Sequence, residues 1–222
     1  MHFDLTHPAS RPWAELGHLL GLGRQAWATF AVRVEPNDWG FEEVEAELVG
    51  AARAGDDDAF QQLVDRYQAT LSTQMRRYSR NQNVVESLVH DVFVEAFLSL
   101  GSFRGNSPFE HWLRKIAVRV GYRHWKRDAR DKRLIQKIRD KPVDAAIMSE
   151  QATDAVDARD QLHAVLEKLS PRDRLVLTLL YWDGNTVAEA AALTGWTQTM
   201  VKVQAHRARK RLKRILEDPD ET

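Results

Sequence analysis

The sequence contains no cysteine, and its formal net charge at pH 7 is zero. Without cysteine the chain cannot form disulfide bonds or a thiolate metal centre. No apolar run approaches the ~20 residues that a membrane-spanning helix requires. The N-terminus also lacks the basic start, apolar stretch and small-residue cleavage site of a secretory signal peptide. We therefore expect a cytoplasmic protein.

The zero net charge conceals three segregated blocks of charge. Residues 35–65 hold ten acidic residues and one arginine, residues 104–141 hold thirteen basic and four acidic residues, and residues 199–216 hold seven basic residues and no acidic one. Clustered lysine and arginine neutralise phosphates. The two basic blocks therefore indicate a nucleic-acid partner better than the total charge does.

The hydrophobic pattern predicts an all-α fold. Strands with a period of two and Asn-Gly hairpins are not evident, whereas apolar residues recur at helical spacing from residue 41 onward. Helices are expected over residues 41–54, 59–79, 84–100, 108–139, 162–169, 171–182, 186–195 and 198–216.

These helices group into two small domains joined by a flexible or partly helical linker, because the stretch between them is rich in Asp and Ala. The predicted divisions are an N-terminal extension of unknown role at 1–40, a first domain at 41–141, the linker at 142–160, a second domain at 161–217 and an acidic tail at 218–222.

The helix that begins after Ser107 combines an apolar stripe with a basic one. Ser107 is placed to cap it, Pro108 suits its first turn, and Glu110 completes the spacing of a capping box. A second stripe follows at helical spacing: Lys115, Arg119, Tyr122 and Lys126. Basic side chains around an aromatic ring suit an unpaired, single-stranded nucleic acid.

The last helix follows a short capped helix and a turn at Gly195, the outline of a helix-turn-helix. Its apolar side is expected to be buried and consists of Val201, Ala205, Ala208, Leu212 and Ile215. A solvated basic helix is the alternative interpretation, but the preceding capped helix and glycine turn favour DNA binding.

Two sets of motifs occur in a characteristic order. The first contains Asp58-Ala-Phe60, Leu88-Val89, Phe103-Arg104-Gly105 and Phe109-x-x-Trp112-Leu113; the second contains Leu169-Ser-Pro-Arg-Asp173, Val201-Lys202 and His206-Arg-Ala-Arg-Lys-Arg-Leu212. With these motifs, over about residues 55–127 and 162–216, the chain resembles the bacterial extracytoplasmic-function (ECF) sigma factors of RNA polymerase. The first set corresponds to sigma region 2 and the second to sigma region 4.

The resemblance implies a protein without catalytic activity, cofactor or metal that binds core RNA polymerase and promoter DNA and promotes transcription initiation. Region 4 would recognise the −35 element through Thr199, Lys202, Val203, Gln204, Arg207 and Lys210. Region 2 would recognise the −10 element through Phe103, Arg104, Asn106, Ser107, Lys115, Arg119, Tyr122, Arg123 and Lys126. Phe103 has an alternative role as a loop anchor packed on its own domain, and Tyr122 has a similar alternative. Phe109, Trp112 and Ile116 are expected in the core.

The helix over residues 84–100 would contact the polymerase. Its predicted core residues are Leu88, Val92, Ala96 and Leu100, and its predicted contact residues are Glu86, Ser87, His90, Asp91, Val94 and Leu98. Family members usually have Asp-Ala-Glu-Asp-Leu-Val-Gln-Glu where this chain has Val84-Val-Glu-Ser-Leu-Val-His-Asp91, so it carries fewer carboxylates there. One hypothesis is that a Ser/Thr kinase phosphorylates Ser87 and restores the negative charge; the alternative is that Glu86 and Asp91 suffice.

Region 4 departs from the family too, because Gln204 and Ala205 replace the usual Arg-Leu and Ala190 replaces an Ile. Promoter preference therefore cannot be transferred from relatives. An anti-sigma factor is a further possible partner, since such proteins often hold free family members.

Two competing interpretations stand beside this one. A helix-turn-helix regulator that never joins polymerase would need neither the 84–100 face nor the 103–127 block. A metal-dependent enzyme would need a ligand pattern that the histidines do not make, because His111 and His124 are too far apart on one helix to share an ion.

Overall fold

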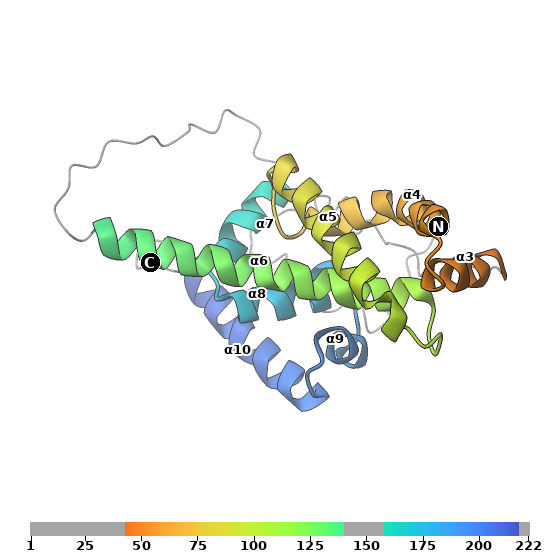
Figure 1. Ribbon diagram of the computed structural model, residues 1–222. Helices are drawn as coiled ribbons and strands as arrows, with labels where there is room; N and C mark the ends of the chain where they lie inside the picture. Colours follow the sequence, from red (N-terminus) through yellow and green to blue (C-terminus); the bar gives the residue numbers. More distant parts are fainter. Residues whose placement is uncertain (1–42, 140–157, 218–222) are drawn as a thin grey trace, which may run out of the picture. The chain divides into compact units, whose positions relative to one another are not determined.

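The computed structural model describes residues 43–139 and 158–217, and all regular structure within these ranges is helical (Figure 1). This confirms the all-α prediction for that part of the chain. The chain divides into two compact units, with the boundary after Asp128, inside the longest helix. The predicted extension at 1–40, the acidic tail at 218–222 and residues 142–157 of the predicted linker lie outside the described residues.

The first unit contains α3 (Glu43–Arg53), α4 (Asp57–Met75), α5 (Gln82–Ser99), the 3-10 turn η1 (Leu100–Ser102) and α6 (Phe109–Arg139) up to the boundary. Helix α4 begins two residues earlier than predicted, because the Asp56 side chain accepts the Ala59 N–H at 3.0 Å. Helix α5 also begins earlier, since the Asn81 side chain accepts the N–H groups of Asn83 and Val84 at 2.9 and 3.4 Å.

The core of this unit lies where the apolar faces of its helices meet. The four core positions predicted over residues 84–100 are at most 3% exposed, and Phe109 and Ile116 are buried as well. Trp112, however, is only partly buried, so its prediction as a core residue was wrong. It lies against Phe103 and Phe109 at the start of α6, with ring centroids 5.3 and 5.4 Å away, and these rings cover only part of the indole.

The second unit contains α7 (Ala158–Glu167), α8 (Pro171–Leu177), the π-helical turn η2 (Thr178–Trp182), α9 (Val187–Thr194) as far as Ala191 and α10 (Gln198–Glu217). Thr186 and Glu189 form the predicted capping box, since the Glu189 N–H donates to the Thr186 hydroxyl at 3.2 Å and the Thr186 N–H donates to the Glu189 carboxylate at 2.7 Å. Helix α7 begins inside the predicted linker.

The helix expected over 171–182 is regular only as far as Leu177. The Asp183 N–H then donates to the Thr178 carbonyl at 2.9 Å, five residues back, and the Asn185 side-chain amide donates to the Leu179 carbonyl at 2.8 Å. These two bonds satisfy carbonyls of the widened turn and lead the chain to Gly184, where φ is +68°.

No helix in the described ranges is long and apolar enough to cross a membrane.

Candidate nucleic-acid interface

The loop between α5 and α6 is held by its own backbone and by one aromatic anchor. The Phe103 N–H donates to the Leu100 carbonyl at 3.0 Å, and Gly105 turns the chain with φ at +72°. The Phe103 ring is 7% exposed and packs edge-on against Phe109, with centroids 5.7 Å apart. Of the two roles considered for Phe103, this packing is that of the loop anchor, because the buried ring offers a base little surface.

The other loop residues predicted to contact DNA are accessible to solvent at least in part. Arg104 and Asn106 are exposed, and Ser107 is half-buried at the start of α6. The anchored Phe103 therefore presents its polar neighbours to solvent.

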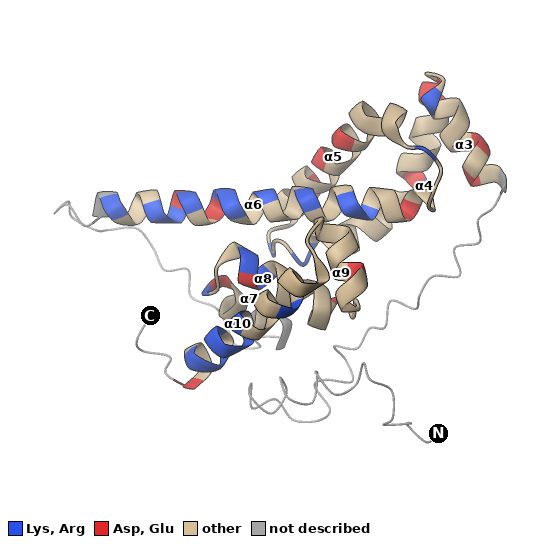
Figure 2. Ribbon diagram, turned by 90° about the horizontal axis from the view of Figure 1, so that it is seen from below, with Lys and Arg blue, Asp and Glu red and all other residues tan. Residues whose placement is uncertain are grey.

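A basic stripe runs along α6, as expected from its spacing, and basic residues recur along the whole helix (Figure 2). Lys115, Arg119, Arg123 and Lys126 are exposed, and Tyr122 is half-buried. The Lys126 ammonium lies 4.9 Å from the centre of the Tyr122 ring. One face of the ring thus already has a cation–π partner, which a stacking base would have to displace or share.

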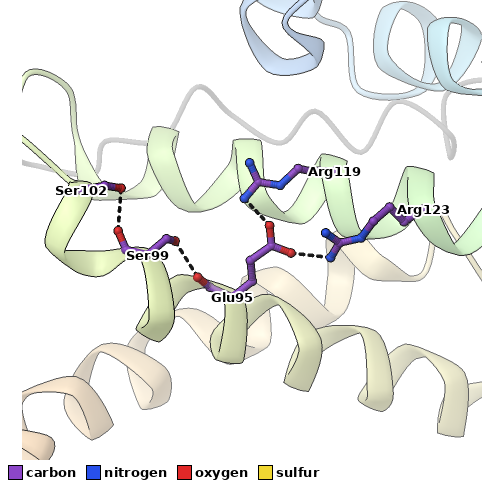
Figure 3. A network of polar contacts seen from close by, with 5 residues as sticks. All are labelled: Glu95, Ser99, Ser102, Arg119 and Arg123. Carbon is purple, nitrogen blue, oxygen red and sulfur yellow. Dashed lines mark hydrogen bonds and ion pairs between the residues drawn. The ribbon is translucent and has the colours of Figure 1, made fainter.

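Two of these basic residues have an acidic partner that the sequence did not reveal. Glu95 of α5 forms ion pairs with both Arg119 and Arg123, one through each carboxylate oxygen (Figure 3). Arg123 and Glu95 are 28 residues apart, so no periodicity within a helix could have indicated the pairing.

The predicted polymerase-binding face of α5 is exposed. Glu86, Ser87 and His90 are exposed and Asp91 is half-buried, while Val94 and Leu98 are 42% and 79% exposed. Phe97 was missed: although its ring packs edge-on against Phe60 at 5.0 Å, it is 49% exposed. The spacing of Val94, Phe97 and Leu98 at i, i+3 and i+4 was a signal that could have found it.

Helix α10 presents most of its predicted contact residues to solvent: Thr199, Lys202, Val203, Arg207 and Lys210. Four of its five predicted core positions are buried, whereas Ile215 is partly exposed. Thr197 caps the helix by accepting the Met200 N–H at 3.2 Å after the turn at Gly195, where φ is +73°.

Gln204 differs from the other predicted contact residues. It is only partly exposed, and its side-chain amide donates to the carboxylate of Asp173, which is fully buried in α8. The same carboxylate pairs with Arg211 and accepts the Ser170 hydroxyl at 2.7 Å. Asp173 therefore joins α8 to α10 and holds Gln204 inside the unit, a role that the sequence did not indicate.

Glu110, in the first turn of α6, is half-buried. Burial raises the pKa of the Glu110 carboxyl above its usual value, and His111 and Arg114 offset part of the rise.

Within residues 43–139 and 158–217, no group of three or more His, Asp or Glu side chains is arranged to hold a metal ion.

Comparison with known proteins identifies both units. Residues 63–131 match the model of "Sigma-70 region 2", and residues 159–212 match that of "Sigma-70, region 4". RNA polymerase sigma-H factor of Pseudomonas aeruginosa is 24% identical over 79% of this chain and 95% of its own length. ECF RNA polymerase sigma factor SigM of Mycobacterium tuberculosis is 27% identical over 79% of this chain and 86% of its own length.

Among solved structures, CnrH in complex with the cytosolic domain of CnrY is 26% identical, with a TM-score of 0.52 over 81% of this chain and all of CnrH. The two sigma regions occur in the expected order and together span more than half of the chain. The chain therefore belongs to the sigma-70 family of bacterial RNA polymerase sigma factors, in its extracytoplasmic-function group.

Proposed function

We propose that this protein binds core RNA polymerase, recognises the −35 and −10 promoter elements and promotes transcription initiation without catalysing a reaction itself. The observation that carries the proposal is the presence of both sigma regions in one chain. Each region exposes the surface that such a role needs: an apolar face on α5, a basic stripe on α6 and a basic face on α10.

Region 2 would hold the non-template strand of the −10 element. Arg104 and Asn106 in the anchored loop would contact an extruded base, and Lys115 and Lys126 on α6 would neutralise phosphates along the strand. Phe103 supports this surface from beneath, since its ring is buried between α6 and the loop.

Region 4 would place the N-terminal part of α10 in the major groove of the −35 element. Thr199, Lys202 and Val203 are exposed in its first two turns, where a recognition helix contacts base edges. Arg207 and Lys210, farther along, would fix phosphates. Gln204 would contribute to DNA contact only after leaving Asp173.

The test is transcription by core polymerase reconstituted with the full-length chain, on promoters selected from a random library. The expected result is specific start sites that depend on the added chain and on two sequence elements. The competing regulator, which does not join polymerase, would instead bind duplex DNA but fail to co-purify with core polymerase or to direct any start site.

Ser87 provides a site for regulation that rests on the same face of α5. Its side chain is exposed one residue from Glu86, where a phosphate would add about two negative charges. If a Ser/Thr kinase gates polymerase binding, Ser87→Asp should bind core polymerase more tightly than Ser87→Ala. Equal affinities of both variants and the unmodified wild type would eliminate the switch and leave Glu86 and Asp91 as sufficient.

A protein inhibitor is the other form of regulation that the structure supports. Val94, Phe97 and Leu98 form an exposed apolar face on α5, and such a face in a free sigma factor is suited to a covering partner. The solved relative CnrH is bound to the cytosolic domain of CnrY. Co-purification of the tagged chain with a second protein that core polymerase displaces would identify an anti-sigma factor.

A further inference from the structure

Glu95 places one carboxylate between two arginines of the basic stripe. Its Oε1 pairs with Arg119 and its Oε2 with Arg123, so the carboxylate bridges side chains one helical turn apart on α6 (Figure 3). Two neighbouring guanidinium groups repel each other; together they carry a charge of +2, and with the shared carboxylate the cluster carries +1. In the free chain, these arginines therefore already have an anionic partner.

A DNA phosphate would bind the guanidinium groups of Arg119 and Arg123 through the same kind of interaction as the Glu95 carboxylate. Carboxylate and phosphate both accept hydrogen bonds from the guanidinium fork. The side chains of Arg119 and Arg123 are 55% and 48% exposed, and that of Glu95 is 21% exposed. Ion pairs this accessible to water are weak, so a phosphate strand can compete with Glu95 for the arginines.

Glu95 also lies beside the other functional parts of region 2. It is next to Val94 on α5, and its backbone carbonyl accepts the Ser99 hydroxyl at 2.6 Å. The Ser99 carbonyl in turn accepts the Ser102 hydroxyl at 2.7 Å, at the base of the loop that carries Phe103 (Figure 3). The Glu95 backbone is thus linked to the base of the loop, while its carboxylate contacts the basic stripe.

We infer that Glu95 is an internal competitor of DNA phosphate, which occupies Arg119 and Arg123 in the free chain and lowers the affinity of region 2 for single-stranded DNA. The inference rests on the proposed function, because it concerns the surface proposed to hold the −10 strand. Such a competitor weakens DNA binding equally for all sequences, since phosphate contacts carry no sequence information.

The test measures binding of the full-length chain to a fluorescent single-stranded oligonucleotide over a range of salt concentrations. Glu95→Gln removes the charge and keeps the shape, and it should tighten binding about three- to tenfold. It should also steepen the slope of log K against log salt by about 0.7 for each phosphate newly contacted. The matched control is Glu47→Gln, which removes the same charge from an exposed position on α3.

A variant lacking both arginines separates competition from other causes. In the background of Arg119→Ala and Arg123→Ala, Glu95→Gln should bring no gain, because no guanidinium is left to release. Urea unfolding of each variant would verify that the fold is retained.

One result would overturn the inference and leave the proposed DNA binding by region 2 intact. In that case wild type binds the oligonucleotide and the double arginine variant binds it less tightly, but Glu95→Gln binds it no more tightly than wild type. An equal gain from Glu47→Gln would also overturn it, since the effect would then be one of overall charge. No salt-dependent binding by any variant would overturn both the inference and the proposed role of region 2 in DNA binding.

Discussion

At Gly121, helix α6 passes directly against the ring of Tyr78. A Cβ atom at this position would overlap three atoms of that ring. The ring cannot easily move away, because it is 3% exposed and lies 4.5 Å from the Trp125 ring, centroid to centroid. Trp125 also donates its indole N–H to the Tyr78 carbonyl at 2.9 Å. Because Gly121 has no side chain, α6 can approach Tyr78, which follows α4, this closely.

Gly121→Ala should destabilise the protein by about 1–3 kcal/mol, because the added methyl group forces a shift in a well-packed core. Gly50→Ala is the matched control, since Gly50 also lies in a helix but has open space around it. There the same change should stabilise the protein by about 0.4–1 kcal/mol. Urea unfolding of both variants measures the difference, and equal effects would contradict the packing argument.

Helix α5 has two faces with different tasks. Its buried residues complete the core of the first unit, whereas Val94, Phe97 and Leu98 face solvent. A cluster of exposed apolar side chains is unfavourable in water and becomes favourable when a partner protein covers it. The element therefore combines a structural role with the proposed polymerase contact.

Leu98→Lys should weaken binding to core polymerase at least about tenfold, because it places a charge in the centre of the proposed apolar contact. Since Leu98 is 79% exposed, the free energy of unfolding should change by no more than about 0.5 kcal/mol. Leu134→Lys on α6 is a control with 59% exposure that lies outside this face. Surface plasmon resonance with immobilised core polymerase would measure both; equal affinities of the two variants would argue against the α5 face.

Helices α8 and α10 are joined through one buried carboxylate. Asp173 accepts the Ser170 hydroxyl at the start of α8 and binds Gln204 and Arg211 of α10. The position of the recognition helix thus depends on a polar contact as well as on the apolar side of α10.

Asp173→Asn should destabilise the second unit by about 1–3 kcal/mol, because a buried network loses its charged acceptor. It should also weaken binding to −35 DNA, since α10 would be held less firmly. Glu217→Gln, which breaks the exposed pair with Lys213, should change stability by less than about 0.5 kcal/mol. Thermal unfolding and DNA titration of both variants provide the comparison, and a loss as small as that of Glu217→Gln would disprove the anchoring role of Asp173.

At the scale of the whole molecule, the two basic surfaces lie in separate units, while the formal net charge is zero. A protein without net charge has little long-range attraction to DNA. Its affinity for a promoter must therefore arise from local contacts of the two regions with DNA. The binding free energies of these contacts add when polymerase holds both regions on one promoter.

Because the two surfaces share no residue, their contributions should be independent. Arg207→Ala on α10 and Lys126→Ala on α6 should each cost about 1 kcal/mol of promoter binding, and the double variant should cost the sum within about 0.5 kcal/mol. The measurement is the Kd of reconstituted holoenzyme for a promoter fragment at fixed salt. A double variant no weaker than the worse single variant would show that the two contacts are not made together.

The sequence by itself determined the helical fold, the starts of α8 and α10 and the family. The helical features depend on neighbours within about four residues: the capping box joins Thr186 to Glu189, and the buried stripe of α10 and the exposed face of α5 repeat at helical spacing. Local chemistry is sufficient to specify them.

Only the tertiary structure decided which polar residues meet. Glu95 lies 28 residues from Arg123, and Asp173 lies 31 residues from Gln204, so these pairs form where separate helices pack together. Packing also buried the Phe103 ring and left Trp112 partly uncovered, because burial at the start of α6 depends on how the loop folds and not on helical spacing alone. The sequence indicated which residues are basic, but helix packing decided which of them are paired within the protein.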